Sequence, residues 1–137
     1  MSYEKTVWAG EGTLAREQEY NDHWCYERGI ITKAWLDVYA ATGDRRFYDA
    51  AKANVDQYVT ADGEILTYEP DKYNLDMICM GRTALRLFKA TGEAKYEKAC
   101  RRLIEQIKGQ PTTAEGGFWH KKLYPQQMWL DGIYMAC

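Results

Sequence analysis

The side chains best suited to chemistry lie close together near the C-terminus of the chain. Trp119, His120, Trp129 and Asp131 all fall within residues 115–135. Tryptophan rings offer flat apolar faces that suit sugars, and a carboxyl or imidazole beside them can transfer protons. A connecting loop is normally small, polar and poor in tryptophan. We therefore interpret this segment as part of a functional site.

A second carboxyl, that of Asp76, stands in the run Tyr73-Asn-Leu-Asp76. Two carboxyls that share a partly dry cleft can hold one proton between them, which is the arrangement that general acid and base catalysis requires. Simpler interpretations exist for each residue. Asp76 and Asp131 stand where helices are expected to begin and could be capping residues, while His120 could be a structural histidine.

Composition argues against several other kinds of function. The 18 basic and 20 acidic residues give a formal net charge of -2, which provides no electrostatic case for binding nucleic acid or an anionic membrane. No window resembles a membrane span or a secretory signal. The four cysteines show no Cys-x-x-Cys spacing, so neither a zinc site nor a redox motif is indicated. We expect a cytoplasmic protein with no metal and no cofactor.

An internal repeat organises the elements that must position these residues. The run Ala41-Thr-Gly-Asp44 aligns with Ala90-Thr-Gly-Glu93 at an offset of 49 residues, and an aromatic residue, Phe47 or Tyr96, follows three positions after each acid. Repeats of this length belong to arrays of one supersecondary unit.

Each repeat predicts a helical hairpin. Apolar residues recur at three- or four-residue steps on both sides of each Thr-Gly turn, as in helices with one apolar face. Gly43 can end the first helix at a positive φ, and Asp44 can cap the next helix. The apolar stripes are Ile31, Trp35, Val38 and Thr42, then Tyr48, Ala51, Val55, Tyr58 and Val59, then Leu75, Ile78, Leu85 and Phe88, then Tyr96, Ala99, Leu103 and Ile107. Only residues 64–68 suggest a short strand.

The expected fold is therefore all-α, with a single domain over residues 1–137. A hairpin cannot cover its own apolar face, so hairpins must stack against neighbours. Two hairpins and the start of a third leave apolar edges open. If the chain is really this short, we expect it to form a homo-oligomer or to bind a partner.

Taken together, several of these segments resemble the unsaturated rhamnogalacturonyl hydrolases of glycoside hydrolase family 105. The resemblance runs from about Trp24 to the C-terminus, and its most specific part is the Trp129-Leu-Asp-Gly132 motif. It rests on Gly116-Gly-Phe-Trp-His120, Pro125-Gln-Gln-Met-Trp-Leu-Asp-Gly-Ile-Tyr-Met135, Thr42-Gly-Asp44, Asp62-Gly63, Tyr73-Asn-Leu-Asp76 and Gly81. It implies an (α/α)6 barrel, of which this chain would supply the truncated N-terminal part, about two and a half of six hairpins.

The resemblance also implies an activity on oligosaccharides that begin with a 4,5-unsaturated uronic acid. In that family, an aspartate at the position of Asp131 protonates the C4=C5 double bond. Water then adds at C5, and the hemiketal collapses to release a keto-deoxyuronate and the remaining sugar. Asp76 matches a second catalytic aspartate that assists in binding and handling water. The implied substrate-binding residues are His120, Trp129, Tyr73 and Trp119.

Two other functions stay open at this point. The chain could be an inactive barrel fragment that acts as a helical self-association or binding module, because its open edges are apolar. It could also belong to another α/α-barrel sugar enzyme, such as an epimerase. The histidine acid/base pair of an epimerase would have to lie mostly beyond Cys137.

Overall fold

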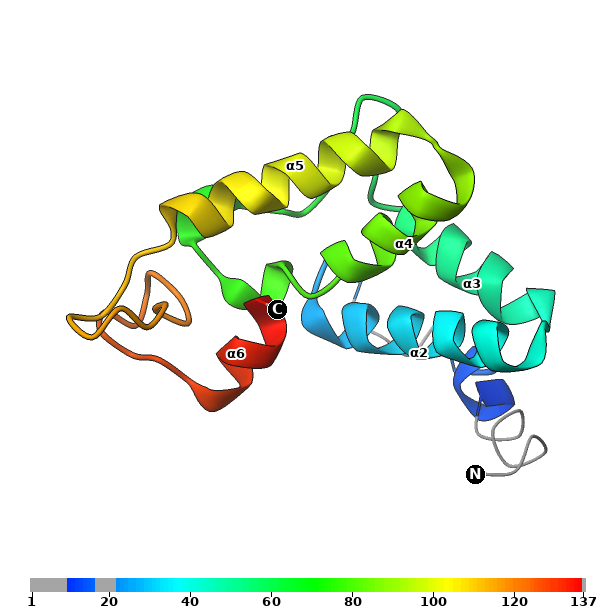
Figure 1. The fold of residues 1–137 in the computed structure, drawn as a ribbon, viewed down its shortest axis with the longest axis horizontal. Coiled ribbons are helices and arrows are strands. Elements are labelled where there is room, and N and C mark those ends of the chain that lie inside the picture. Colours follow the sequence, from blue (N-terminus) through cyan, green and yellow to red (C-terminus); the bar gives the residue numbers. More distant parts are fainter. Residues whose placement is uncertain (1–9, 17–21, 137) are drawn as a thin grey trace.

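The computed structural model describes residues 10–16 and 22–136, and this part of the chain is helical without a strand. Two hairpins dominate it, and a short helix follows them (Figure 1). The predicted all-α hairpin fold is thus confirmed. The helices are α2 (Tyr26–Thr42), α3 (Arg45–Asp56), α4 (Gly81–Thr91), α5 (Ala94–Gly109) and α6 (Leu130–Ala136), with 3-10 turns η2 (Pro70–Lys72) and η3 (Leu75–Met77).

The two hairpins turn in nearly the same way, as the repeat predicts. Gly43 and Gly92 end α2 and α4 with φ values of 75° and 70°, a left-handed conformation that glycine adopts without a steric penalty. The Asp44 side chain caps α3 by accepting a hydrogen bond from the Arg46 amide. Glu93 makes no such cap, and its carboxylate instead lies 3.2 Å from Nζ of Lys52 in the other hairpin.

The hairpins pack on each other through α2 and α4, which lie side by side. The hydroxyl oxygens of Thr32 and Thr83 are 2.9 Å apart in this buried contact. Gly29 permits the close approach, because a Cβ there would lie 2.8 Å from the Met80 amide nitrogen. The fully buried side chains of the core include Trp24, Trp35, Phe47, Val55, Leu75, Met80, Leu87 and Tyr96.

Two local predictions were wrong. The first helix of the second hairpin begins at Gly81 rather than near Leu75, and residues 75–77 form a 3-10 turn instead. The Asn74 side chain caps this turn by accepting a hydrogen bond from the Asp76 amide, so Asp76 is not the capping residue. Residues 64–68 form no strand, only an isolated bridge between Val59 and Ile65.

The described helices also include none that combines the length and apolar character needed to cross a bilayer.

Candidate active site

The Asp76 carboxylate is the centre of a polar cluster that joins η3 to the loop after α5. Its Oδ1 lies 3.2 Å from Nε2 of His120, and its Oδ2 lies 2.6 Å from Nζ of Lys121. The His120 side chain is 1% exposed and that of Asp76 is 14% exposed. Each oxygen of this half-buried carboxylate therefore has its own partner, and one of those partners is a cation.

Aromatic rings form one wall of this cluster. The indole of Trp129 stacks on the His120 imidazole at a centroid distance of 4.3 Å and an interplanar angle of 9°. Tyr124 stacks on Trp129 at 5.2 Å. Trp129 remains 37% exposed, so part of its apolar ring is available to a ligand such as a sugar.

Asp131 completes the cluster from α6, where it lies in the first helical turn. One ligand atom each from Asp131, Asp76 and His120 fall within 4.8 Å of one another. The structure thus brings the two candidate catalytic aspartates together, as expected for residues at the same end of a hairpin array. Asp131 is exposed, and no ion pair or hydrogen bond involves its side chain within the part of the chain described here.

These three residues could also offer ligands to a metal ion, since an imidazole and two carboxylates are common donors. However, the Lys121 ammonium already binds the free oxygen of Asp76. A metal ion would have to approach beside this fixed positive charge. The arrangement therefore favours proton transfer and binding of a polar ligand over binding of a cation.

Tyr73 and Trp119 lie on the two chain segments that carry the cluster, but their rings point to different surroundings. The Tyr73 phenol packs near Gly109 at the end of α5, and Nζ of Lys122 lies 5.8 Å from its ring centroid. Trp119 is half-buried, and its indole nitrogen has no hydrogen-bond partner within the described residues. Whether these two residues bind substrate stays a prediction.

Sequence reasoning missed Lys121 and Tyr124 as neighbours of the site. Both follow His120 within four positions, and the available signal was a lysine directly after the predicted substrate-binding histidine. The negative charge of Asp76 also acts on Tyr26. The pKa of its phenol is raised, chiefly by the negative charge of Glu27, with a smaller contribution from Asp76.

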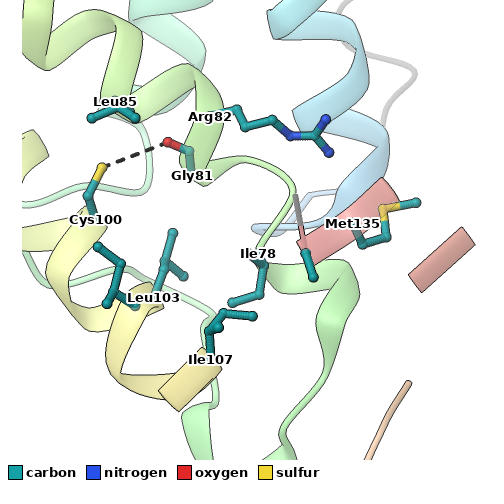
Figure 2. Close-up of a pocket in the computed structure, with 10 residues that line it drawn as sticks. Ile78, Gly81, Arg82, Leu85, Cys100, Leu103, Ile107 and Met135 are labelled. Carbon is teal, nitrogen blue, oxygen red and sulfur yellow. Dashed lines mark hydrogen bonds between the residues drawn. The ribbon is translucent and has the colours of Figure 1, made fainter. Parts of the chain in front are cut away.

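A separate apolar groove lies between α4, α5 and α6 (Figure 2). Its volume is about 240 Å³. Figure 2 shows Leu85, Leu103, Ile107 and Met135 around it, and Arg82 is the one charged residue among the described residues that line it. None of these described lining residues carries a carboxyl or an imidazole, so the groove is distinct from the candidate site.

Comparisons with known proteins fix the family. Residues 5–137 match the family model described as Glycosyl Hydrolase Family 88. The chain belongs to this family.

A solved structure shows which part of a family member this chain resembles. The protein is described as a "C. acetobutylicum ATCC 824 Glycoside Hydrolase From Family 105". The two chains share 37% identity with a TM-score of 0.88 over 98% of this chain, which spans 37% of the length of that one. The match to the N-terminal part of an α/α barrel confirms the resemblance to family 105 drawn from the motifs.

Proposed function

We propose that this chain supplies the acid–base wall of a glycoside hydrolase that acts on oligosaccharides ending in a 4,5-unsaturated uronic acid. The observation that carries the proposal is the meeting of Asp131 with an Asp76 carboxylate already bound by His120 and Lys121. Similarity to a family 105 glycoside hydrolase supports it.

The surroundings of the two carboxyls divide the roles between them. Asp76 has an ammonium group and an imidazole on its two oxygens, which hold the carboxylate in place. Asp131 has no such partner among the described residues, and it is exposed in the first turn of α6. Asp131 is therefore the carboxyl that is free to approach a ligand, and we give it the proton-donor role that the resemblance to family 105 implies.

The reaction would consume one water molecule. Asp131 donates a proton to C4 of the double bond, and the oxygen of water bonds to C5 while a carboxylate of the pair accepts the proton that water loses. The resulting hemiketal opens to a ketone at C5. The C1 hemiacetal then releases the remaining sugar as an alcohol. Trp129 would hold the flat unsaturated ring, and His120 and Lys121 would keep Asp76 in place.

The test follows the loss of ultraviolet absorbance of the conjugated double bond when the chain is mixed with an unsaturated rhamnogalacturonan disaccharide. Wild type should consume the absorbance, whereas Asp131→Asn should lower the rate by roughly 10²- to 10⁴-fold. Asp49→Asn is a matched control, because Asp49 is exposed on α3 and, among the described residues, pairs only with Arg45. Undiminished activity in Asp131→Asn, or no activity in wild type, would rule out the proposal for this chain.

A second candidate function, helical self-association, is favoured by the apolar groove. Leu85 and Ile104 line it and are 42% and 51% exposed. Exposed apolar surfaces of this kind often mark interfaces. This candidate concerns how the chain assembles, so it is compatible with the hydrolase proposal.

A further inference from the structure

Gln110 lies between the two chain segments that build the candidate site. It follows α5 directly and is 5% exposed. Its side-chain Nε2 donates hydrogen bonds to the carbonyl oxygens of Tyr73, at 2.7 Å, and of Trp119, at 2.8 Å. Both N–H groups of this buried amide therefore bind main-chain carbonyls.

These two carbonyls are close in sequence to the groups that do the chemistry. Tyr73 precedes the turn that carries Asp76, and Trp119 directly precedes His120. A main-chain hydrogen bond from the Leu75 amide to the His120 carbonyl, 3.0 Å long, joins the same two segments. The Gln110 amide therefore helps to set the distance between Asp76 and His120.

The backbone at Tyr73 has an unfavourable conformation that neighbouring contacts must stabilise. Its φ is 45°, a left-handed conformation that is strained for a residue with a Cβ. Such strained residues persist when surrounding contacts over-determine them, and they concentrate at functional sites. The hydrogen bond from Gln110 to the Tyr73 carbonyl is one such contact.

A second buried glutamine orients the first. Nε2 of Gln106 donates to Oε1 of Gln110 at 3.2 Å and to the Asn74 carbonyl at 3.1 Å, while the Tyr68 hydroxyl donates to Oε1 of Gln106 at 2.8 Å. Burial raises the pKa of Tyr68 to about 12, so its hydroxyl stays a donor at neutral pH. This chain of bonds fixes which way the Gln110 amide faces.

We propose that Gln110 is a positioning residue that sets the geometry of the Asp76–His120 pair through the backbone of both segments. It does not touch the reacting atoms. The inference rests on the proposed function for its role in catalysis, but the geometric part can be tested without substrate. Outer contacts of this kind typically change activity by 10- to 100-fold when removed.

The test uses Gln110→Glu, which keeps the shape but removes both donors, and Gln110→Leu. The tautomer of His120 is read from long-range 1H–15N correlations. The chain contains only two histidines, so His23→Gln assigns the signals. Wild type should show His120 fixed with its proton on Nε2, toward Asp76. Both Gln110 variants should show a mixture of tautomers and, in the disaccharide assay, a fall in kcat of about 10- to 100-fold with little change in KM.

Gln57→Leu is the matched control, because Gln57 also directly follows the second helix of a hairpin but is exposed. It should leave the His120 tautomer and kcat unchanged. Altered tautomers in a chain that lacks activity would support the positioning role while the proposed function fails. Folded Gln110 variants with an unchanged His120 signal would overturn the inference. Loss of the whole fold in both variants, seen by circular dichroism, would also overturn it, since Gln110 would then maintain the fold rather than the site.

Discussion

The His120 imidazole has almost no free space around it. Trp129 covers one face of the ring, and Gly132 of α6 approaches the ring so closely that a Cβ would lie 3.0 Å from Nδ1. Only a residue without a side chain lets α6 bring Asp131 this near to the imidazole. The glycine of the Trp-Leu-Asp-Gly motif is thus explained by packing rather than by backbone conformation.

Gly132→Ala should therefore displace the imidazole or α6 by a few tenths of an ångström, since the added methyl also meets Leu75 at 3.3 Å. We expect a 10-fold or larger loss of activity, as misplaced catalytic groups lose rate steeply, with a stability cost of about 1–3 kcal/mol. Disaccharide turnover and urea unfolding would measure the two effects. Gly116→Ala is a poor control because of its φ of 88°, whereas Gly12 meets no atom within 4 Å and serves well. Full activity in Gly132→Ala would contradict the packing explanation.

Asn54 is a buried polar residue away from the site. It lies on α3, is 0% exposed, and neither polar atom of its side chain has a hydrogen-bond partner among the described residues. Leucine has a similar shape and no such unmet groups, so Asn54→Leu should raise the free energy of unfolding by about 1–3 kcal/mol. Asn74→Leu should instead destabilise, because the Asn74 side chain caps η3. Thermal melts would distinguish the two, and a lower Tm for Asn54→Leu would refute the first expectation.

Among single residues, the sequence predicted Asp131, Asp76, His120 and Trp129 because they stand in specific motifs. The structure brings all four together. It could not predict Gln110. Glutamine gives no sequence signal for a role that depends on two carbonyls from distant segments. Such partners become visible only when the backbone path is known.

The contact between α2 and the start of α4 determines how the two hairpins pack. A Cβ on Gly29 would lie 2.8 Å from the Met80 nitrogen and 2.9 Å from the Cys79 carbonyl carbon. Backbone atoms cannot move aside as a flexible side chain can. This glycine therefore fixes the separation between α2 and the chain just after Asp76.

Gly29→Ala should destabilise the fold by about 1–3 kcal/mol through overpacking. Gly12→Ala, in the helical residues 10–14, has open space around it and should be neutral or slightly stabilising, since alanine favours helix. Chemical unfolding of both variants gives the comparison. Equal free energies of unfolding for Gly29→Ala and Gly12→Ala would mean that α2 and α4 can move apart without loss of stability.

Salt bridges around Asp56 join α3 to α5. Its carboxylate binds Lys52 and Lys95 at 2.8 Å and accepts a hydrogen bond from the Tyr96 hydroxyl at 2.6 Å. Burial alone would raise the pKa of Asp56, but these partners outweigh it and hold the pKa below the usual 3.8. A depressed folded-state pKa contributes stability above the unfolded value, and that stability is lost as pH falls.

The stability of wild type should therefore decline as pH falls below about 3.8, the value for Asp56 in the unfolded chain. Asp56→Asn should be less stable than wild type at pH 7, and the difference should shrink as the solution becomes more acidic. Urea unfolding at a series of pH values measures this. Asp62→Asn provides the control, since Asp62 is exposed in a turn and makes no ion pair within the described residues. If the difference in the free energy of unfolding between Asp56→Asn and wild type stays constant with pH, protonation of Asp56 is not coupled to stability.

The hairpins themselves were predictable because their signals are local. The Thr-Gly-acid turn and the three- or four-residue apolar steps determine each helix from within its own segment. The 3-10 turn at η3 was not predictable, since Leu75 and Ile78 continue the helical spacing. Distant partners determine the backbone there: the Trp24 indole donates to the Met77 carbonyl at 2.6 Å, and the Leu75 amide donates to His120.

Comparison of the two repeats shows that the apolar groove corresponds to a face that is buried in the first hairpin. Leu36 and Val55 of the first hairpin are 3% and 0% exposed. Their equivalents at the 49-residue offset, Leu85 and Ile104, are 42% and 51% exposed and line the groove. The face that one hairpin buries is therefore left uncovered by the other.

We accordingly expect this chain to self-associate through the groove, as the exposed apolar edge predicts. Sedimentation velocity over a range of concentrations should show an increasing average mass, and Leu85→Glu or Ile104→Glu should reduce it. Leu66→Glu is the control, because Leu66 is 50% exposed but lies outside the groove. A wild type that stays monomeric at high concentration would exclude the groove as an interface between copies.

The docking of α6 has a consequence for how the candidate site comes together. The described turns of α6 dock with Gly132 and Met135 buried, in contact with η3. Asp76 is in place as soon as the second hairpin and the loop to His120 have formed. Asp131, the carboxyl that we propose as proton donor, reaches Asp76 only through this docking, so we expect any variant that loosens α6 to separate the two carboxyls while leaving both hairpins folded.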